Sequence, residues 1–125
     1  MFKKVIYNIV NHSKGKTICS NAKLANNYFT RLKGLMFKKS LDNNECLAFY
    51  NAPSIHTCFM RFPLDLVFID KDKKVIKICE GIKPWRFVIS RGSYLTLEFS
   101  PNKISTENIE LGDILELFPH NTSKV

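Results

Sequence analysis

The sequence lacks any apolar run that approaches the about 18 residues needed to cross a membrane as a helix. Its apolar-leaning N-terminal stretch, Lys4–Val10, is interrupted by Asn8 and leads into polar residues instead of a small-residue cleavage site. This pattern does not fit a signal peptide and instead predicts a strand followed by a turn. We therefore expect a cytoplasmic protein without a transmembrane segment.

The sequence also lacks cysteine pairs at metal-binding spacing. Its four cysteines, Cys19, Cys46, Cys58 and Cys79, are isolated from one another. Zinc sites usually need two ligands separated by two to four residues, so we expect no metal and no cofactor. A chain of 125 residues is long enough to build one core without disulfides, so we interpret the cysteines as small buried apolar residues in a single domain, 1–125.

Acidic residues are absent from the first 40 positions, which hold nine Lys or Arg, whereas the remaining 85 hold ten basic and eleven acidic residues. Such asymmetry can mark a surface for nucleic acid or another polyanion. The lysines are spread out, however, and no aromatic interleaving is evident, so the pattern argues against nucleic acid. Polyanion binding remains an alternative that would use Lys3, Lys4, Lys14, Lys16, Lys23, Lys33, Lys38 and Lys39.

Short apolar stretches separated by turn residues dominate the second half of the chain and predict strands. The strands expected there are 46–50, 55–60, 64–69, 75–79, 85–89, 94–99 and 114–118, with an irregular segment at 101–108 that has room for one helical turn and a tail at 119–125. Helical spacing of apolar residues predicts one short helix, Asn27–Gly34. The fold class is therefore mainly β, a sandwich or barrel, with one short helix.

No common catalytic signature is present, and the polar residues of interest gather in 54–65. If Ile55–Met60 is a strand, His56 and Cys58 share a face. They could then form a base and nucleophile pair, or His56 and Asp65 could hold a metal. The alternative that we favour is a half-buried His56 that bonds the backbone.

The pair Arg61 and Asp65 flanks Pro63, which restricts the backbone and predicts a rigid corner. The two charges are interpreted either as an ion pair that ties this corner or as the rim of an anion pocket. Trp85 is the only tryptophan, and we interpret it as an anchor in the core or at its rim.

Several of these stretches together resemble the hallmarks of the domain-of-unknown-function 192 family, over about residues 18–117. They are the Arg31–Phe37 segment with its Gly-Leu-Met, the stretch Ile55–Asp70, and the motifs Lys83–Arg86, Leu95–Glu98 and Leu111–Asp113. The resemblance implies a mainly β fold with a short helix that carries Arg31, and it implies no activity.

Two departures from the family pattern stand out. The family usually places a small residue and then glycine after its Leu-Glu, where this chain has Ser100-Pro101-Asn102. Many members also carry an N-terminal export signal or anchor, which we do not find in this sequence.

Most of these motifs build the fold, but seven polar residues are not explained that way: Arg31, His56, Thr57, Arg61, Asp65, Arg86 and Glu98. The leading hypothesis is a small non-enzymatic binding or accessory module whose partner is unknown. Its polar pocket would be centred on His56, Arg61 and Asp65, and these side chains should then face one concavity. An enzyme of unknown class that uses His56 as acid or base is the alternative.

Overall fold

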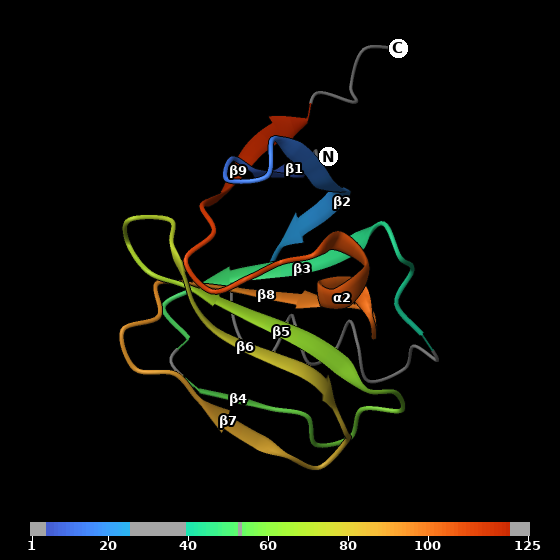
Figure 1. The fold of residues 1–125 in the computed structure, drawn as a ribbon. Helices are drawn as coiled ribbons and strands as arrows, with labels where there is room; N and C mark the ends of the chain where they lie inside the picture. The colour runs from blue at the N-terminus through green and yellow to red at the C-terminus, as the bar shows by residue number, and fades with distance from the viewer. Residues whose placement is uncertain (1–4, 26–39, 53, 121–125) are drawn as a thin grey trace.

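The computed structural model describes residues 5–25, 40–52 and 54–120, and within them the chain is mainly β with one short helix (Figure 1). The elements are β1 (Ile6–Asn11), β2 (Lys16–Leu24), β3 (Glu45–Tyr50), β4 (Ser54–His56), β5 (Leu64–Ile69), β6 (Val75–Ile82), β7 (Phe87–Ile89), β8 (Leu95–Phe99), α2 (Lys103–Glu107) and β9 (Leu115–His120). The mainly β prediction is confirmed. The predicted helix Asn27–Gly34 lies outside the described residues, and α2 forms within the segment that was expected to be irregular.

Seven strands form one sheet in the order β6-β5-β8-β3-β2-β1-β9. Neighbours pair antiparallel except β2 and β3, which are parallel. Two backbone hydrogen bonds, each 2.9 Å, link the start of β6 to the start of β9. Leu115 N donates to Lys73 O, and Val75 N donates to Asp113 O. Because these contacts join the two outer strands, the sheet curls into a partly closed barrel.

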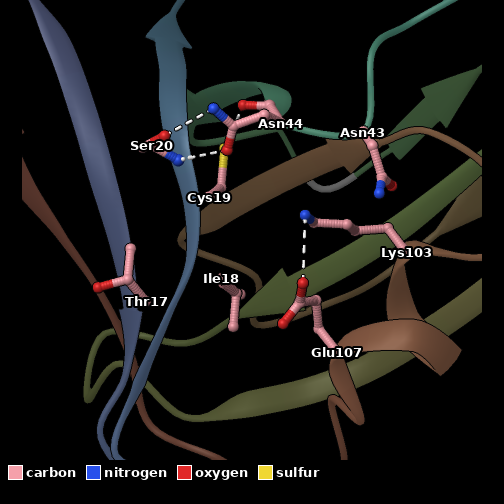
Figure 2. Close-up of a pocket in the computed structure, with 8 residues that line it drawn as sticks. All are labelled: Thr17, Ile18, Cys19, Ser20, Asn43, Asn44, Lys103 and Glu107. Carbon is pink, nitrogen blue, oxygen red and sulfur yellow. Dashed lines mark hydrogen bonds and ion pairs between the residues drawn. The ribbon is translucent and has the colours of Figure 1, made fainter.

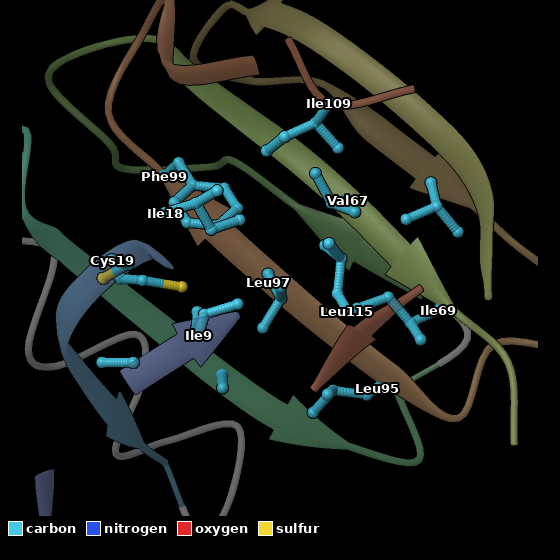
Figure 3. Packing of buried hydrophobic residues seen from close by; sticks show 14 of the residues in the cluster. Ile9, Ile18, Cys19, Val67, Ile69, Leu95, Leu97, Phe99, Ile109 and Leu115 are labelled. Atoms are coloured by element: carbon cyan, nitrogen blue, oxygen red, sulfur yellow. The ribbon is translucent and has the colours of Figure 1, made fainter. Parts of the chain in front are cut away.

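The inside of this barrel is the main apolar core (Figure 3). Strand β8 contributes Leu95, Leu97 and Phe99, and the paired strand β5 contributes Val67 and Ile69. Alternate residues of a strand point to opposite faces, so the side chains between them face away from this core.

A second apolar cluster covers the outer face of β5 and β8. Leu64, Leu66 and Phe68 of β5 pack there with Ile55 of β4 and Val88 of β7. The short sheet of β4 and β7 therefore forms a second layer, and Figure 1 places it at the end of the molecule opposite the C-terminus. Because both faces of β5 are covered, all six of its residues are buried, and five of them are apolar, with Asp65 as the exception.

Four predicted boundaries are wrong by two or more residues, and the first is the start of β7, which begins at Phe87 where the sequence predicted residue 85. β4 ends at His56, where the sequence predicted a strand to Met60, and Phe59 adopts a left-handed φ of 67° that no strand continues through. β6 extends to Ile82 into the predicted loop. β9 continues through Pro119 into the predicted tail; it pairs only with β1, and a proline is tolerated on such an edge strand.

The corner after β8 is built without glycine. Asn102 adopts a φ of 72°, a left-handed conformation that asparagine accepts more readily than other residues with a side chain. The departure from the family pattern at Ser100-Pro101-Asn102 therefore preserves a sharp turn into α2. None of the helices among the described residues has the length and apolar character required to span a bilayer.

Candidate functional site

Thr57, which is fully buried, connects the loop after β4 to the loop before β7. Its Oγ1 donates to Lys83 O at 2.6 Å and accepts from Arg86 N at 2.9 Å. Its backbone N donates to Arg86 O, and its carbonyl accepts from Trp85 N at 3.0 Å. One side chain and its own peptide groups thus fix the path of both loops.

Two aromatic residues project from these loops into solvent. Phe59 is 54% exposed and Trp85 is 60% exposed, and both have a positive φ, 67° and 65°. Their rings meet edge to face, with centroids 4.7 Å apart and planes at 60°. Of the two places expected for Trp85, the core is wrong, because Trp85 is mostly exposed and has Phe59 as its ring partner.

The outer face of β7 extends this apolar surface. Phe87 and Ile89 are 65% and 53% exposed, while Val88 between them packs inward. His56 pairs directly with Phe87 across the short sheet and so shares its face. We call Phe59, Trp85, Phe87 and Ile89 the apolar patch.

The chain around the apolar patch carries only positive charge. Residues 51–64 and 81–97, which contain β4, β7 and their loops, include Arg61, Lys83, Arg86 and Arg91 but no Asp or Glu. All four of these cationic residues are exposed. The only described contact that a side chain of the four makes is the one from Arg86 Nη1 to Pro84 O, at 3.4 Å.

Asp65 has a different role from the one that its position beside Pro63 suggested. It is fully buried, and its Oδ1 accepts from Gly81 N at 2.8 Å while its Oδ2 accepts from Ile104 N at 3.0 Å. Gly81 lies where the register of β5 and β6 shifts, so the carboxylate supports a β-bulge and fastens α2 to the sheet. Because both described partners are backbone amides, the ion pair considered between Arg61 and Asp65 is not formed.

Glu98 is also fully buried, but it lies on the other side of the sheet. It pairs with Leu47 and Leu66, which face the second apolar cluster, whereas Asp65 pairs with Phe99 of the barrel core. Asp65 and Glu98 therefore do not share a concavity. Arg31, the remaining predicted site residue, lies outside the described residues.

His56 is half-buried, and its Nδ1 accepts from Cys58 N at 3.3 Å. This contact to the backbone fits the interpretation that we favoured for His56. The face shared with Cys58 depended on a strand that ends at His56, so the argument for a base and nucleophile pair no longer holds. Within the described residues, no group of three or more His, Cys, Asp or Glu is placed to hold a metal ion.

Carboxylates near the C-terminus offset part of the N-terminal positive charge. Lys14 Nζ lies 2.8 Å from both Glu110 Oε1 and Asp113 Oδ2, and Lys16 Nζ lies 3.4 Å from Glu107 Oε1. Lys3, Lys4, Lys33, Lys38 and Lys39 lie outside the described residues. Lys14 and Lys16 are therefore less available to a polyanion than the sequence suggested.

Sequence reasoning missed Phe59, Phe87 and Ile89 because strand periodicity does not show which face remains uncovered. A usable signal was present in the local charge, since the aromatic-rich stretches around Phe59 and Trp85 contain cations and no anions. The predicted residues His56, Thr57 and Arg86 lie next to this patch, whereas Asp65 and Glu98 do not.

The fold and this site define a small, mainly β module with an exposed apolar patch. Residues 9–117 match the family model DUF192, which is described as an uncharacterized ACR. The chain belongs to this family, as the motifs beginning at Arg31 indicated, and the family supports no specific function.

Sequence relatives of this chain include UPF0127 proteins from Pyrococcus and Thermococcus. The UPF0127 protein PF1050 of Pyrococcus furiosus is 34% identical over 86% of this chain and 96% of its own length. A UPF0127 protein of Thermococcus sibiricus is 31% identical over 86% of this chain and 73% of its own length.

Two crystal structures share the fold at 23% identity. One, from Sinorhizobium meliloti 1021 and described provisionally as a transcription regulator, has a TM-score of 0.78 and covers 93% of this chain and 95% of its own. The other, a protein of unknown function from Novosphingobium aromaticivorans, has a TM-score of 0.76. The match covers 90% of this chain and 84% of the other protein's chain. This likeness establishes the fold alone.

Proposed function

We propose that this protein is a binding or accessory module that docks an acidic segment of a partner protein on its apolar patch. The observation that carries the proposal is the pair Phe59 and Trp85, whose rings are exposed at backbone conformations that ordinarily cost stability. Backbone strain of this kind persists where the surroundings enforce it, and Thr57 does so here. Exposed apolar patches with polar rims are typical of interaction sites.

The charge around the apolar patch supports an acidic partner. Arg61, Lys83, Arg86 and Arg91 lie within two residues of its members along the chain, and the stretches 51–64 and 81–97 contain no carboxylate. Complementary charges steer association and select partners, while buried aromatic residues supply most of the affinity. We therefore expect a partner segment in which carboxylates flank an aliphatic or aromatic side chain, with His56 and Arg86 at the polar rim.

A protein partner fits the apolar patch better than single-stranded nucleic acid does. Nucleic-acid platforms present open aromatic faces on which successive bases stack. Here the rings of Phe59 and Trp85 contact each other edge to face, and Ile89 has no ring. The four cysteines, all free thiols, support the proposal that this binding occurs in the reducing cytoplasm.

The test is a selection of displayed random peptides on the intact protein, with removal of peptides that also bind a Trp85→Ser, Phe87→Ser double variant. The proposal predicts enriched sequences that combine carboxylates with at least one large apolar residue. The matched control is Leu111→Ser, which alters a side chain that is 66% exposed outside the apolar patch and should retain the selected peptides.

Three results would contradict the proposal: no enrichment over the double variant, enrichment of basic peptides, or loss of the peptides on Leu111→Ser. A parallel arm measures binding of a random single-stranded oligonucleotide pool at equal concentration. If the oligonucleotides bind more tightly than the peptides and the double variant abolishes this binding, the partner of the apolar patch is nucleic acid and the proposal is wrong.

A further inference from the structure

A polar cavity of about 320 Å³ lies between β2 and α2, outside the apolar patch (Figure 2). Its lining includes Thr17, Cys19, Asn43, Lys103 and Glu107. Small-molecule sites commonly enclose about 300–1,000 Å³, so this cavity has room for a small ligand only. None of the six predicted site residues that the structure describes lines it.

Lys103 is a buried cation with few partners. Only 3% of the residue is exposed, yet its ammonium group faces the cavity (Figure 2). Its one described side-chain contact is with Glu107 Oε2 at 3.5 Å, which is long for a charge-assisted bond. An ammonium group has three N–H donors, so much of its hydrogen-bonding capacity is directed at the cavity.

Glu107 does not neutralise the cavity, because its carboxylate is shared. Its Oε1 lies 3.4 Å from Lys16 Nζ, while its Oε2 contacts Lys103. Glu107 therefore balances only one of these two cations, while the nearby Asp65 carboxylate accepts from the backbone amide of Ile104 and has no described contact with either lysine. Burying a charge is costly unless further hydrogen bonds or opposite charges compensate it.

Neighbouring groups also favour an anion. The Asn43 side chain lies near Lys103 in Figure 2, and its Oδ1 accepts from Ser100 Oγ at 3.5 Å, so its amide N–H donors remain for a ligand. The pKa of the Cys19 thiol is lowered mainly by a hydrogen bond from Cys46 and further by the charge of Lys103. The charge of Lys103 thus acts on a thiol that lines the cavity, whereas the charge of Glu45 raises the pKa of this thiol.

We propose that this cavity binds a small oxyanion, a carboxylate or a phosphate, between Lys103 Nζ and the Asn43 side-chain amide. Lysine serves as a point charge for such groups, and the amide adds a directional donor. The volume leaves room for a few further atoms of an organic ligand. This inference is independent of the partner proposed for the apolar patch.

The test is a titration of ¹⁵N-labelled full-length protein with inorganic phosphate and, separately, with acetate at constant ionic strength. Saturable amide shifts confined to the chain around Thr17, Asn43 and Lys103 are expected for at least one of the two anions. The stronger of the two identifies which oxyanion the cavity prefers. Shifts that are unsaturable or spread over the surface lysines would overturn the proposal.

Three variants separate anion binding from folding. Lys103→Met should weaken binding at least tenfold, and Asn43→Leu, at an exposed rim position, should weaken it several-fold while the spectrum elsewhere stays unchanged. Glu107→Gln removes the competing carboxylate and should tighten binding. The control Lys74→Met, which alters an exposed lysine outside the cavity, should change nothing. Weaker binding in Glu107→Gln, or unchanged binding in Asn43→Leu, contradicts the assignment.

Discussion

Single buried side chains hold this fold together where its strands bend. Asp65 accepts hydrogen bonds from two backbone amides, one in a β-bulge and one in α2. Thr57 ties the loops around the apolar patch, because its Oγ1 donates to Lys83 O and accepts from Arg86 N. Buried amides without partners are costly, so each of these residues stabilises a local shape more than it offers a site for chemistry.

Replacing Asp65 with asparagine should reduce the free energy of unfolding by about 1–3 kcal/mol. Asparagine has one acceptor oxygen, so either Gly81 N or Ile104 N would face an amide donor. Urea unfolding measures the loss. The control Asp72→Asn alters an exposed carboxylate and should change stability by less than about 0.5 kcal/mol. Equal losses of unfolding free energy in Asp65→Asn and Asp72→Asn would contradict the structural role of Asp65.

The two most buried thiols should differ in reactivity. A hydrogen bond from Cys46 lowers the pKa of Cys19, whereas burial raises the pKa of Cys46 well above its ordinary value. Because the thiolate is the reactive form, iodoacetamide should modify Cys19 faster than Cys46 in the folded protein. Mass spectrometry of peptides after timed alkylation measures both rates, and faster modification of Cys46 would contradict the pKa order.

At the scale of elements, the short sheet of β4 and β7 has two functions. Its inner face, with Ile55 and Val88, closes the second apolar cluster, while its outer face presents Phe87 and Ile89 to solvent. The loops at one end are tied through Thr57, so the aromatic pair Phe59 and Trp85 is held in a fixed arrangement.

Replacing Thr57 with valine should loosen these loops without disrupting the barrel. The bonds of Oγ1 to Lys83 O and Arg86 N are lost, while the backbone bonds remain. We expect a loss of about 1–3 kcal/mol in unfolding free energy and faster hydrogen exchange at the Trp85 and Arg86 amides. The matched control is Thr106→Val on α2, where the threonine is exposed. Unchanged hydrogen exchange at these amides in Thr57→Val would contradict this role, because the loops would then keep their conformation without the Thr57 hydroxyl.

Strand periodicity predicted the sheet elements well and the loop geometry poorly. β5 begins at Leu64 and ends at Ile69 as expected, because burial on both faces leaves an apolar run that only Asp65 interrupts. β4 stops early because the turn at Phe59 depends on hydrogen bonds between Thr57 and residues that are distant in the sequence. For example, Arg86 N donates to Thr57 Oγ1 across 29 positions. No local pattern encodes such a contact.

The sequence also assigned to the candidate pocket residues that lie apart in the structure, for a related reason. Alternation within one strand does not tell which residue of another strand shares its face, because register is set by pairing between distant segments. Asp65 and Glu98 were both assigned to one candidate pocket but lie on opposite faces of the sheet. Trp85 was expected in the core or at its rim because large aromatic residues are highly buried on average, and the structure shows it mostly exposed.

At the scale of the whole molecule, ion pairs connect the N-terminal hairpin to the last third of the chain. Lys14 contacts Glu110 and Asp113, and Asn11 Nδ2 donates to Asp113 Oδ2 at 2.9 Å. On the far side of β9, Lys73 contacts Glu116 at 2.8 Å. Lys14 and Lys16 are thus paired in the fold, and the structure describes no carboxylate contact for the cations around the apolar patch.

Asp113 should make stability depend on pH in the acid range. Burial raises its pKa, but hydrogen bonds from Lys14, Asn11 and the Glu110 amide outweigh burial, and the folded-state pKa lies below the ordinary 3.8. Its contribution is therefore fully present above pH 3.8 and is lost as pH falls through the lower folded value. Asp113→Asn should reduce the drop in unfolding free energy between neutral and acid pH, measured by urea unfolding at each pH. An unchanged drop would contradict this assignment.

The central claim is that the apolar patch is a docking surface for an acidic segment. Titration of a peptide chosen by the selection above, followed through the fluorescence of Trp85, tests it most directly because this is the only tryptophan. Docking predicts a saturable change in Trp85 emission, with a dissociation constant that rises about tenfold or more in Phe59→Ser and Arg86→Glu and stays constant in Leu111→Ser. Saturable binding that leaves Trp85 emission unchanged and is equal in all variants would contradict it.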